Sequence, residues 1–317
     1  MKKLLFTITT AIISLLLPVA TQAQTVRKVI NINRGWLFHS GESTPSITTA
    51  KAKADGWKLV NVPHDFQIEQ PWVAPDASEK ADNSDAGANI KSRLSARGFK
   101  EMGGGWYVKT FTPASEDKGK RCLIDFQGIM YLGDVYLNGK RIGGTDYGYV
   151  GFEIDITKAL RYGEENTIAV YANTADSKNS RWYTGGGLFR DVNIVYTDSK
   201  LYFNRHPLCI STRENKYVDI TADVQCNTKQ PNIAMQVIVT SPDGTVVSDK
   251  KYNLKRIRSY RYGQEFSIPS IEIADAKLWD CEHPNLYTAT ARPPREVGSV
   301  RDEVTPRFGI REVSLVP

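Results

Sequence analysis

Residues 218–226 alternate strictly between apolar and polar side chains, and this period of two constrains the fold more than any other feature of the chain. The apolar series comprises Val218, Ile220, Ala222, Val224 and Cys226. Successive side chains of an extended strand point to opposite faces, so the run predicts a half-buried strand. A second strand is expected over 233–240, and it is followed by Ser-Pro-Asp-Gly at 241–244, which is typical of a turn.

The same pattern of short apolar runs separated by turn residues continues through the chain. Asn138-Gly139 stands between apolar runs at 134–137 and 141–142, which predicts a two-residue hairpin. Further strands are expected over 167–172 and 192–196. Many short strands with glycine, proline and asparagine between them predict an all-β protein built from sandwiches.

Helical periodicity is nearly absent from the sequence. One short helix is predicted near 156–160, with Asp155 or Thr157 as its N-cap. The chain divides near 197–200, which gives a first domain over 24–198 and a second over 199–317. The length of the second domain suits a seven-stranded immunoglobulin-like sandwich.

The segment 1–23 has the pattern of an export signal. Lys2 and Lys3 precede an apolar run over 4–20, and small residues lead to an expected cleavage after Ala23. The alternative is a membrane anchor, but the run is short for a membrane span. We therefore expect a mature chain that is exported to the periplasm or the extracellular space and has no membrane partner.

Charge and cysteine content exclude several classes of function. The chain has 41 basic and 35 acidic side chains, and the basic ones are scattered, so no nucleic-acid partner is expected. The four cysteines lack metal-ligand spacing, and buried thiols are the favoured interpretation, with a Cys226–Cys281 disulfide left open. We predict no metal and no cofactor.

The segment 67–98 is long, polar and weakly patterned, which is typical of a functional or disordered loop. It contains Asp76, Asp82 and Asp85, whose spacing does not match a calcium-binding loop.

Short motifs rich in glycine and aromatic residues run in a fixed order along the chain. They are Gly35-Trp36-Leu37-Phe38, Val62-Pro63-His64-Asp65-Phe66, Gly104-Gly105-Trp106-Tyr107, Phe126-Gln127-Gly128, Tyr136-Leu137-Asn138-Gly139, Ser180-Arg181-Trp182-Tyr183, Gly187-Leu188-Phe189-Arg190-Asp191, His283-Pro284-Asn285-Leu286-Tyr287 and Phe308-Gly309-Ile310-Arg311.

Together these motifs resemble the N-terminal half of glycoside hydrolase family 2, the β-galactosidase and β-glucuronidase family. The resemblance covers nearly all of the mature chain. It implies a jelly-roll sandwich of the galactose-binding-like kind, followed by an immunoglobulin-like sandwich. In the family, a (β/α)8 barrel follows these domains and carries two catalytic glutamates.

We expect that barrel to be absent from this sequence. The chain stops at Pro317, soon after the motif at 308–311, and a barrel needs about 250 residues. The family places its acid/base glutamate directly after an asparagine, and the sequence contains no Asn-Glu dipeptide. We therefore assign no catalytic residue.

The resemblance implies the non-catalytic N-terminal region of a retaining glycosidase that hydrolyses O-glycosyl bonds. Its expected partners are the missing barrel and, with the barrel present, a terminal β-linked sugar; assembly with further copies of the chain is left open. Two alternatives remain: a stand-alone exported carbohydrate-binding protein, and a purely structural or adhesive pair of sandwiches.

Two places offer the carboxylates and aromatic rings that bind sugars. The resemblance implies that Asp65, beside His64, reaches from the jelly-roll into the barrel's pocket; alternatively, Asp65 caps local backbone amides in a turn. A second loop with Arg181, Trp182 and Tyr183 also approaches the pocket in the family, and packing at the domain junction is the alternative for its aromatic residues. These five residues are the predicted substrate contacts.

Other conspicuous residues have structural interpretations. The glycine runs 103–105 and 185–187 lack the lysine and serine of a phosphate loop, so turn geometry is expected. Arg190 and Asp191 are predicted to form a structural ion pair. The tryptophans expected to fill the sandwich core or its rim are Trp36, Trp57 and Trp106.

Overall fold

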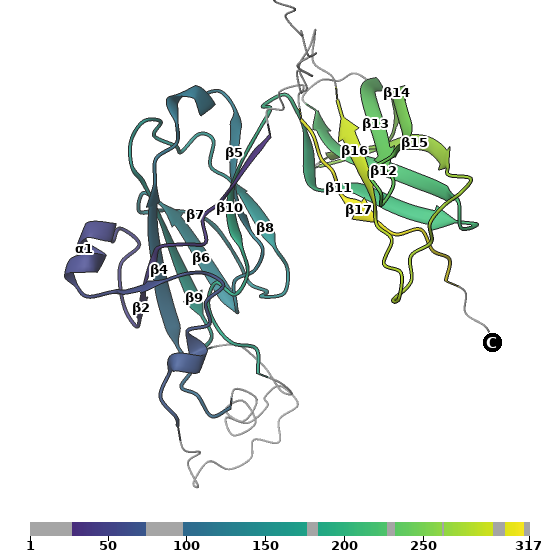
Figure 1. The fold of residues 1–317 in the computed structure, drawn as a ribbon. Helices are drawn as coiled ribbons and strands as arrows, with labels where there is room; N and C mark the ends of the chain where they lie inside the picture. The colour runs from purple at the N-terminus through teal and green to yellow at the C-terminus, as the bar shows by residue number, and fades with distance from the viewer. Residues whose placement is uncertain are drawn as a thin grey trace, which may run out of the picture.

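The computed structural model describes residues 27–73, 98–175, 183–226, 232–261, 263–293 and 302–313. The expected export signal and the three aspartates of the 67–98 segment lie outside these residues. Two β-sandwiches follow one another along the chain (Figure 1). No helix within the described ranges is long and apolar enough to cross a bilayer.

The first sandwich has two antiparallel sheets that face each other. The six-stranded sheet contains, in spatial order, β3 (Lys58–Val60), β2 (Trp36–Ser40), β4 (Gly104–Phe111), β9 (Asn166–Asn173), β6 (Leu132–Leu137) and β7 (Lys140–Thr145). The four-stranded sheet contains β1 (Lys28–Asn31), β10 (Val192–Thr197), β5 (Arg121–Phe126) and β8 (Phe152–Asp155). The expected strands at 167–172 and 192–196 are confirmed as β9 and β10, and the sandwich has the predicted jelly-roll class.

Aromatic and branched side chains from both sheets fill the space between them. Trp36, Tyr107, Phe126 and Tyr196 are among the buried residues of this core. Trp57 and Trp106 belong to a second cluster, on the outer face of the six-stranded sheet, that also contains Ala52 of α1 (Thr49–Ala54). The expectation that these tryptophans fill the sandwich core or its rim is therefore confirmed for Trp36, whereas Trp57 and Trp106 pack beneath α1 on the outer face.

The helical elements of the described chain are all short. They are α1, whose N-cap Thr48 accepts a hydrogen bond from the Lys51 amide, and the two 3-10 helices η1 (Gln67–Glu69) and η2 (Ser115–Asp117). The helix predicted near 156–160 is wrong. A single turn forms there instead, in which Asp155 accepts from the Thr157 amide and the Ile156 carbonyl accepts from the Ala159 amide. One turn gives too few hydrogen bonds to propagate a helix.

The predicted hairpin at Asn138-Gly139 is confirmed between β6 and β7. Both residues have positive φ, 52° and 81°, as a two-residue turn between twisted strands requires.

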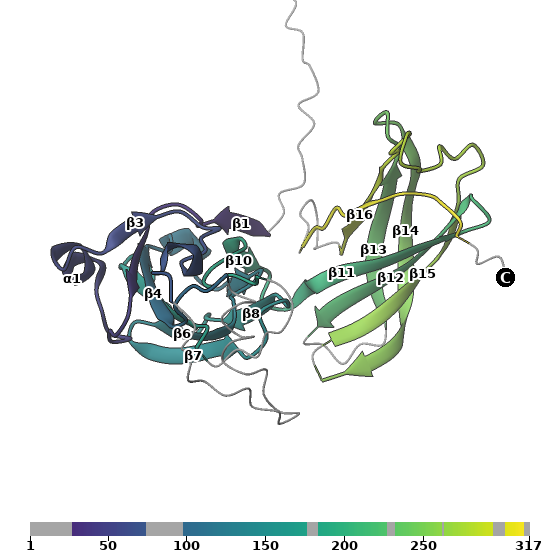
Figure 2. The same ribbon diagram turned by 90° about the horizontal axis from the view of Figure 1, so that it is seen from below.

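The second sandwich is formed by the remaining strands. In spatial order they are β11 (Leu201–Arg213), β12 (Tyr217–Cys226), β15 (Gly263–Glu272), β14 (Val246–Tyr260), β13 (Asn232–Thr240), β16 (Tyr287–Arg292) and β17 (Arg307–Phe308). The strand β14 pairs with β13 through its first part and with β15 through its last part, so it belongs to both layers (Figure 2). This arrangement agrees with the expected immunoglobulin-like class.

The alternation predicted over 218–226 is confirmed in β12. All five apolar residues are buried, and the four from Val218 to Val224 belong to the second core together with Phe203, Met235, Phe266 and Tyr287. The turn at 241–244 is also confirmed, because the Gly244 amide donates to the Ser241 carbonyl at 3.0 Å.

All four cysteines are free. Cys122 and Cys226 are buried, as expected, but Cys209 and Cys281 are exposed. The Cys226–Cys281 disulfide that the sequence left open is therefore not formed, since one thiol lies in the core and the other on the surface.

A buried carboxylate joins the two ends of the described chain. Asp302 accepts two hydrogen bonds from the Arg27 guanidinium, at 2.7 and 2.9 Å, and one from the Phe203 amide at 2.8 Å. Arg27 also donates to the Phe203 carbonyl. A second bond crosses between the sandwiches where Arg205 of β11 donates to Asp125 of β5 at 3.0 Å.

At one end of the first sandwich, two loop segments are joined by backbone hydrogen bonds. The His64 amide donates to the Leu188 carbonyl at 2.7 Å, and the Phe66 amide donates to the Gly186 carbonyl at 2.9 Å. Gly187, between them on the second segment, has φ of +113°, and a Cβ there would lie 2.1 Å from the Tyr107 hydroxyl. Only glycine fits this position.

We predict that Asp302→Asn lowers the stability of the native chain by about 2 kcal/mol. The substitution keeps the shape of the side chain but removes the charge that Arg27 and the Phe203 amide bond, and hydrogen bonds to charged groups are the strong ones. Calorimetric unfolding measures the change. Asp249→Asn is the matched control, because Asp249 is exposed on β14 and bonds Gln236; equal midpoints for the two variants would contradict the prediction.

We also predict that Gly187→Ala destabilises the first sandwich by about 3 kcal/mol, from strain at positive φ together with overpacking against Tyr107. Gly244→Ala separates the two effects, because Gly244 also has positive φ, of +87°, but nothing lies within 4 Å of its added Cβ. That control should cost only about 1 kcal/mol. Urea unfolding of the two variants checks the difference, and equal losses would show that the contact with Tyr107 is unimportant.

Candidate functional site

Asp65 lies in the loop segment that follows β3, and its carboxylate is held by this loop and by a second one. Its Oδ1 accepts from the Gln67 amide at 3.0 Å and from the Gly186 amide at 2.8 Å. Its Oδ2 accepts from the Tyr183 hydroxyl at 2.8 Å. The structure therefore brings together Asp65 and Tyr183, which are 118 positions apart in the sequence.

In this geometry Asp65 caps a turn, which was the alternative role predicted for it from the sequence. The Gln67 amide is the local amide of that turn, but the Gly186 amide and the Tyr183 hydroxyl come from a distant loop. A carboxylate oxygen can accept two hydrogen bonds, so Oδ2 retains one acceptor position beside the Tyr183 hydroxyl. Capping a turn and binding a ligand hydroxyl are thus compatible at this carboxylate.

His64 points inward, behind Asp65. Its Nδ1 bonds the Tyr107 hydroxyl at 2.8 Å, and its ring packs edge-on against Phe38. The side chain is 11% exposed, and burial lowers the pKa of His64 below its ordinary value. Nε2 lies 3.8 Å from a Glu69 carboxylate oxygen. The structure therefore places His64 where it positions the Asp65 segment.

Tyr107 supports both segments of the site from the core. Burial raises the pKa of Tyr107 far above its ordinary value, so the phenol keeps its proton. Its hydroxyl also lies against the loop backbone at Gly187, where an added Cβ would be 2.1 Å away. One buried phenol thus fixes the His64 side chain and the loop that supplies the Gly186 amide.

Two buried polar residues that the sequence analysis missed complete the support. The Gln67 side chain accepts from the Thr174 hydroxyl at 2.7 Å and donates to the Glu101 carbonyl. The Thr174 amide donates to the Gly103 carbonyl at 2.8 Å, and the Thr174 hydroxyl accepts from the Gly103 amide at 3.3 Å. A glutamine directly after a motif and a threonine at the end of a strand carry no distinctive sequence signal.

The other predicted contacts, Arg181 and Trp182, lie outside the described residues. Of the five residues predicted to contact substrate, the structure therefore locates His64, Asp65 and Tyr183. Tyr183 is 40% exposed, so its ring is accessible from solvent beside the Asp65 carboxylate.

Two structural expectations near the site are wrong. Arg190 and Asp191 do not pair; the Arg190 guanidinium lies over the Phe189 ring, and Asp191 accepts from the Asn33 side chain at 2.8 Å. The glycines Gly104 and Gly105 do not form a turn but begin β4. A Cβ at Gly105 would lie 2.5 Å from the Phe38 ring, so close ring packing explains that glycine. Turn geometry does hold for Gly185, with φ of +70°.

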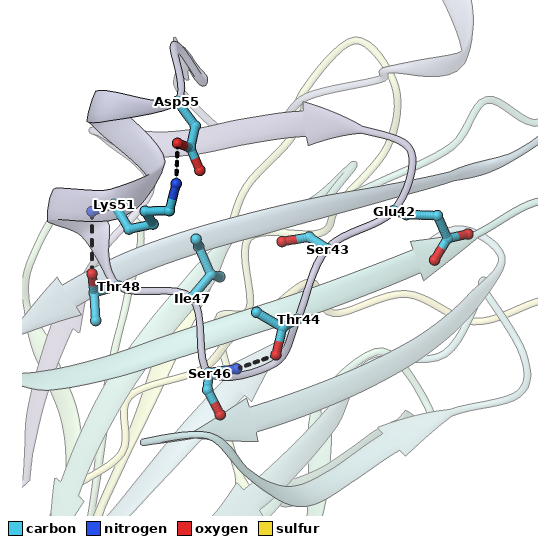
Figure 3. Close-up of a pocket in the computed structure, with 8 residues that line it drawn as sticks. All are labelled: Glu42, Ser43, Thr44, Ser46, Ile47, Thr48, Lys51 and Asp55. Atoms are coloured by element: carbon cyan, nitrogen blue, oxygen red, sulfur yellow. Dashed lines mark hydrogen bonds and ion pairs between the residues drawn. The ribbon is translucent and has the colours of Figure 1, made fainter.

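A separate hollow lies beside α1 on the outer face of the six-stranded sheet (Figure 3). Its volume is about 540 Å³, and its lining comprises Glu42, Ser43, Thr44, Ser46, Ile47, Thr48, Lys51 and Asp55. Asp55 is paired with Lys51, and Glu42 points away from that pair in Figure 3. The hollow lacks an aromatic ring and a facing pair of carboxylates, so it offers neither sugar stacking nor acid/base chemistry.

In the part of the chain that the structure describes, no group of three or more His, Cys, Asp or Glu side chains gathers.

Two family models match the chain. The model for glycosyl hydrolases family 2 matches residues 208–311, and the model for the glycosyl hydrolase 2 galactose-binding domain-like family matches residues 102–183. Each match falls within one of the two sandwiches.

Curated relatives carry glycosidase names. A putative beta-glucuronidase of Formosa agariphila is 29% identical over 300 residues, which are 93% of this chain and 26% of the relative. Beta-galactosidase BoGH2A of Bacteroides ovatus is 27% identical over 91% of this chain and 32% of its own length. The chain thus spans between a quarter and a third of these relatives.

A solved family 2 member from Bacteroides cellulosilyticus superimposes with a TM-score of 0.73 and 26% identity, over 90% of this chain and 36% of that structure. The order of the motifs, the two sandwiches and the family models agree with one another. This chain belongs to glycoside hydrolase family 2 and corresponds to the N-terminal region of its enzymes.

Proposed function

We propose that the two sandwiches support the catalytic barrel of a β-glycosidase and that Asp65 and Tyr183 bind a hydroxyl group of the terminal sugar. The observation that carries the proposal is the acceptor position left on Asp65 Oδ2, next to the Tyr183 hydroxyl. A carboxylate accepts a strong hydrogen bond from a sugar hydroxyl, and the phenol can bond a neighbouring hydroxyl.

The rigidity of the site supports this role. Asp65 Oδ1 is fixed by two amides, and His64 and Gln67 on either side are held by Tyr107 and Thr174. A carboxylate that is held in place loses little further freedom when a ligand binds. Such a group suits the discrimination of one hydroxyl configuration from another.

The names of the relatives suggest the substrate class. They include beta-glucuronidases and beta-galactosidases, so we propose a terminal β-linked galactose or uronic acid as the substrate of the whole enzyme. Hydrolysis with retention uses two carboxylates about 5 Å apart, one as nucleophile and one as acid/base. We assign both to the barrel rather than to residues of the sandwiches.

We predict that this chain alone does not hydrolyse nitrophenyl β-galactoside or β-glucuronide, whereas a protein that joins it to a family 2 barrel encoded in the same reading frame does. The reason is that the two sandwiches supply contacts and support but no catalytic pair. Release of nitrophenol from matched amounts of the two proteins measures this. Turnover by the chain alone would overturn the assignment of catalysis to a barrel.

In the barrel-containing protein, we predict that Asp65→Asn lowers kcat/KM between 10- and 100-fold and that Tyr183→Phe lowers it about fivefold. These losses correspond to about 1.4–2.8 kcal/mol and about 1 kcal/mol of binding to the transition state, the usual range for charged and neutral hydrogen bonds.

The control for Asp65→Asn is Asp134→Asn, because Asp134 on β6 forms an exposed ion pair with Arg141. It should leave kcat/KM within twofold. Thermal midpoints of all variants separate a loss of folding from a loss of binding. Unchanged kcat/KM in the folded Asp65→Asn variant would show that Asp65 serves only as a turn cap.

A further inference from the structure

Two tyrosines on the loop between β7 and β8 expose much of their rings. Tyr147 is 49% exposed and Tyr149 is 40% exposed, and their ring centroids lie 5.7 Å apart at an angle of 57°. Val150 beside them is 57% exposed. Single exposed apolar residues are ordinary on a protein surface, but adjacent ones mark a site of interaction more often.

The backbone of this loop is fixed at three points. The Thr145 hydroxyl donates to the Tyr147 carbonyl at 2.9 Å and accepts from the Tyr147 amide at 3.2 Å. A Cβ at Gly148 would lie 2.4 Å from Met130 Sδ, and one at Gly151 would lie 2.2 Å from the Arg205 guanidinium. The loop therefore packs tightly through its backbone while it presents both rings to solvent.

A series of backbone and packing contacts connects this loop to the Asp65 site. Met130, against which Gly148 packs, exchanges two backbone hydrogen bonds with Gly187, at 2.8 and 2.6 Å. Two residues earlier, Gly185 lies against the carboxylate, because a Cβ there would be 2.7 Å from Asp65 Oδ2. The two tyrosines thus belong to the same end of the first sandwich as Asp65 and Tyr183.

We propose that Tyr147 and Tyr149 form a second carbohydrate contact, which binds sugar units of a β-linked oligosaccharide beyond the unit held at Asp65. Aromatic rings cover the C–H faces of pyranose units, and phenol groups bond their hydroxyls. Tyrosine supplies this contact with little loss of side-chain entropy, and the fixed backbone lowers the cost further. The statement that these sugar units lie beyond a unit bound at Asp65 rests on the proposed function of Asp65.

Saturation-transfer NMR and isothermal titration of the present chain test the proposal. The probes are galactotetraose and a hyaluronan tetrasaccharide with terminal glucuronic acid, each compared with methyl β-galactoside and methyl β-glucuronide. We expect one tetrasaccharide to bind about tenfold more tightly than its methyl glycoside, with saturation reaching its internal units.

The variants are Tyr147→Ala/Tyr149→Ala and Asp65→Asn, with Tyr260→Ala as the control. Tyr260 lies on β14 of the second sandwich and is 38% exposed, so its loss removes a comparably exposed ring at a distant place. The double variant should bind the tetrasaccharide no more than twofold better than the methyl glycoside. The Tyr260→Ala control should retain the tenfold preference.

The outcomes separate this inference from the proposed function. If Asp65→Asn leaves every affinity unchanged while the double variant weakens tetrasaccharide binding, the role of Asp65 fails and the tyrosine contact stands. Wild-type affinity in the double variant, or no binding of any probe by the wild-type chain, overturns the tyrosine contact. The alternative is that a second copy of the chain binds at the two tyrosines, and sedimentation velocity tests it. A wild-type dimer that becomes a monomer in the double variant would show that the tyrosine pair is a contact between copies and would overturn the sugar contact.

Discussion

The hydroxyl of Tyr107 is the contact on which the arrangement of the candidate site depends. It belongs to a fully buried ring on β4, it bonds the His64 side chain, and it lies against the backbone at Gly187. These two partners lie on the two segments that pair beside Asp65, so one group from the core sets the position of both. Because the phenol lies so close to the chain at Gly187, the loop can pass only with a glycine there. The requirement for glycine, the edge-on histidine and the position of the carboxylate thus share one physical cause.

Asp65 shows how a structural role and a binding role can occupy one side chain. A buried or half-buried carboxylate needs hydrogen bonds to offset its lost hydration, and the Gln67 and Gly186 amides supply them at Oδ1. If backbone amides also occupied both acceptor positions of Oδ2, Asp65 would serve only as a cap of the turn. Instead, Oδ2 meets Tyr183, a side chain that is itself exposed. The asymmetry between the two oxygens is therefore the feature that distinguishes a candidate ligand contact from an ordinary turn.

Much of the fold could be predicted from local patterns. Alternation identified β12, and Asn138-Gly139 identified the β6–β7 hairpin, because the period of two and the positive φ of a tight turn leave direct signatures in the sequence. Asp65 and Tyr183 were named only through family resemblance, since nothing local reveals that residues so distant in the chain meet. Gln67 and Thr174 were missed because their buried partners are set by tertiary packing. The prediction of an Arg190–Asp191 ion pair was wrong for the same reason. Asn33, from the connection between β1 and β2, donates to Asp191 instead.

The contact of Arg205 with both Asp125 and the Gly151 backbone gives the second sandwich an influence on the loops of the first. Arg205 lies on β11, just after the chain leaves the first sandwich, and its guanidinium would be 2.2 Å from a Cβ at Gly151. The bidentate contact between Arg27 and the buried Asp302 holds the same two sandwiches together near Phe203. A rotation of one sandwich against the other would break both sets of charged hydrogen bonds, each of which is stronger than a neutral one. The orientation of the two domains is therefore part of what positions the β7–β8 loop, on which the proposed second sugar contact lies.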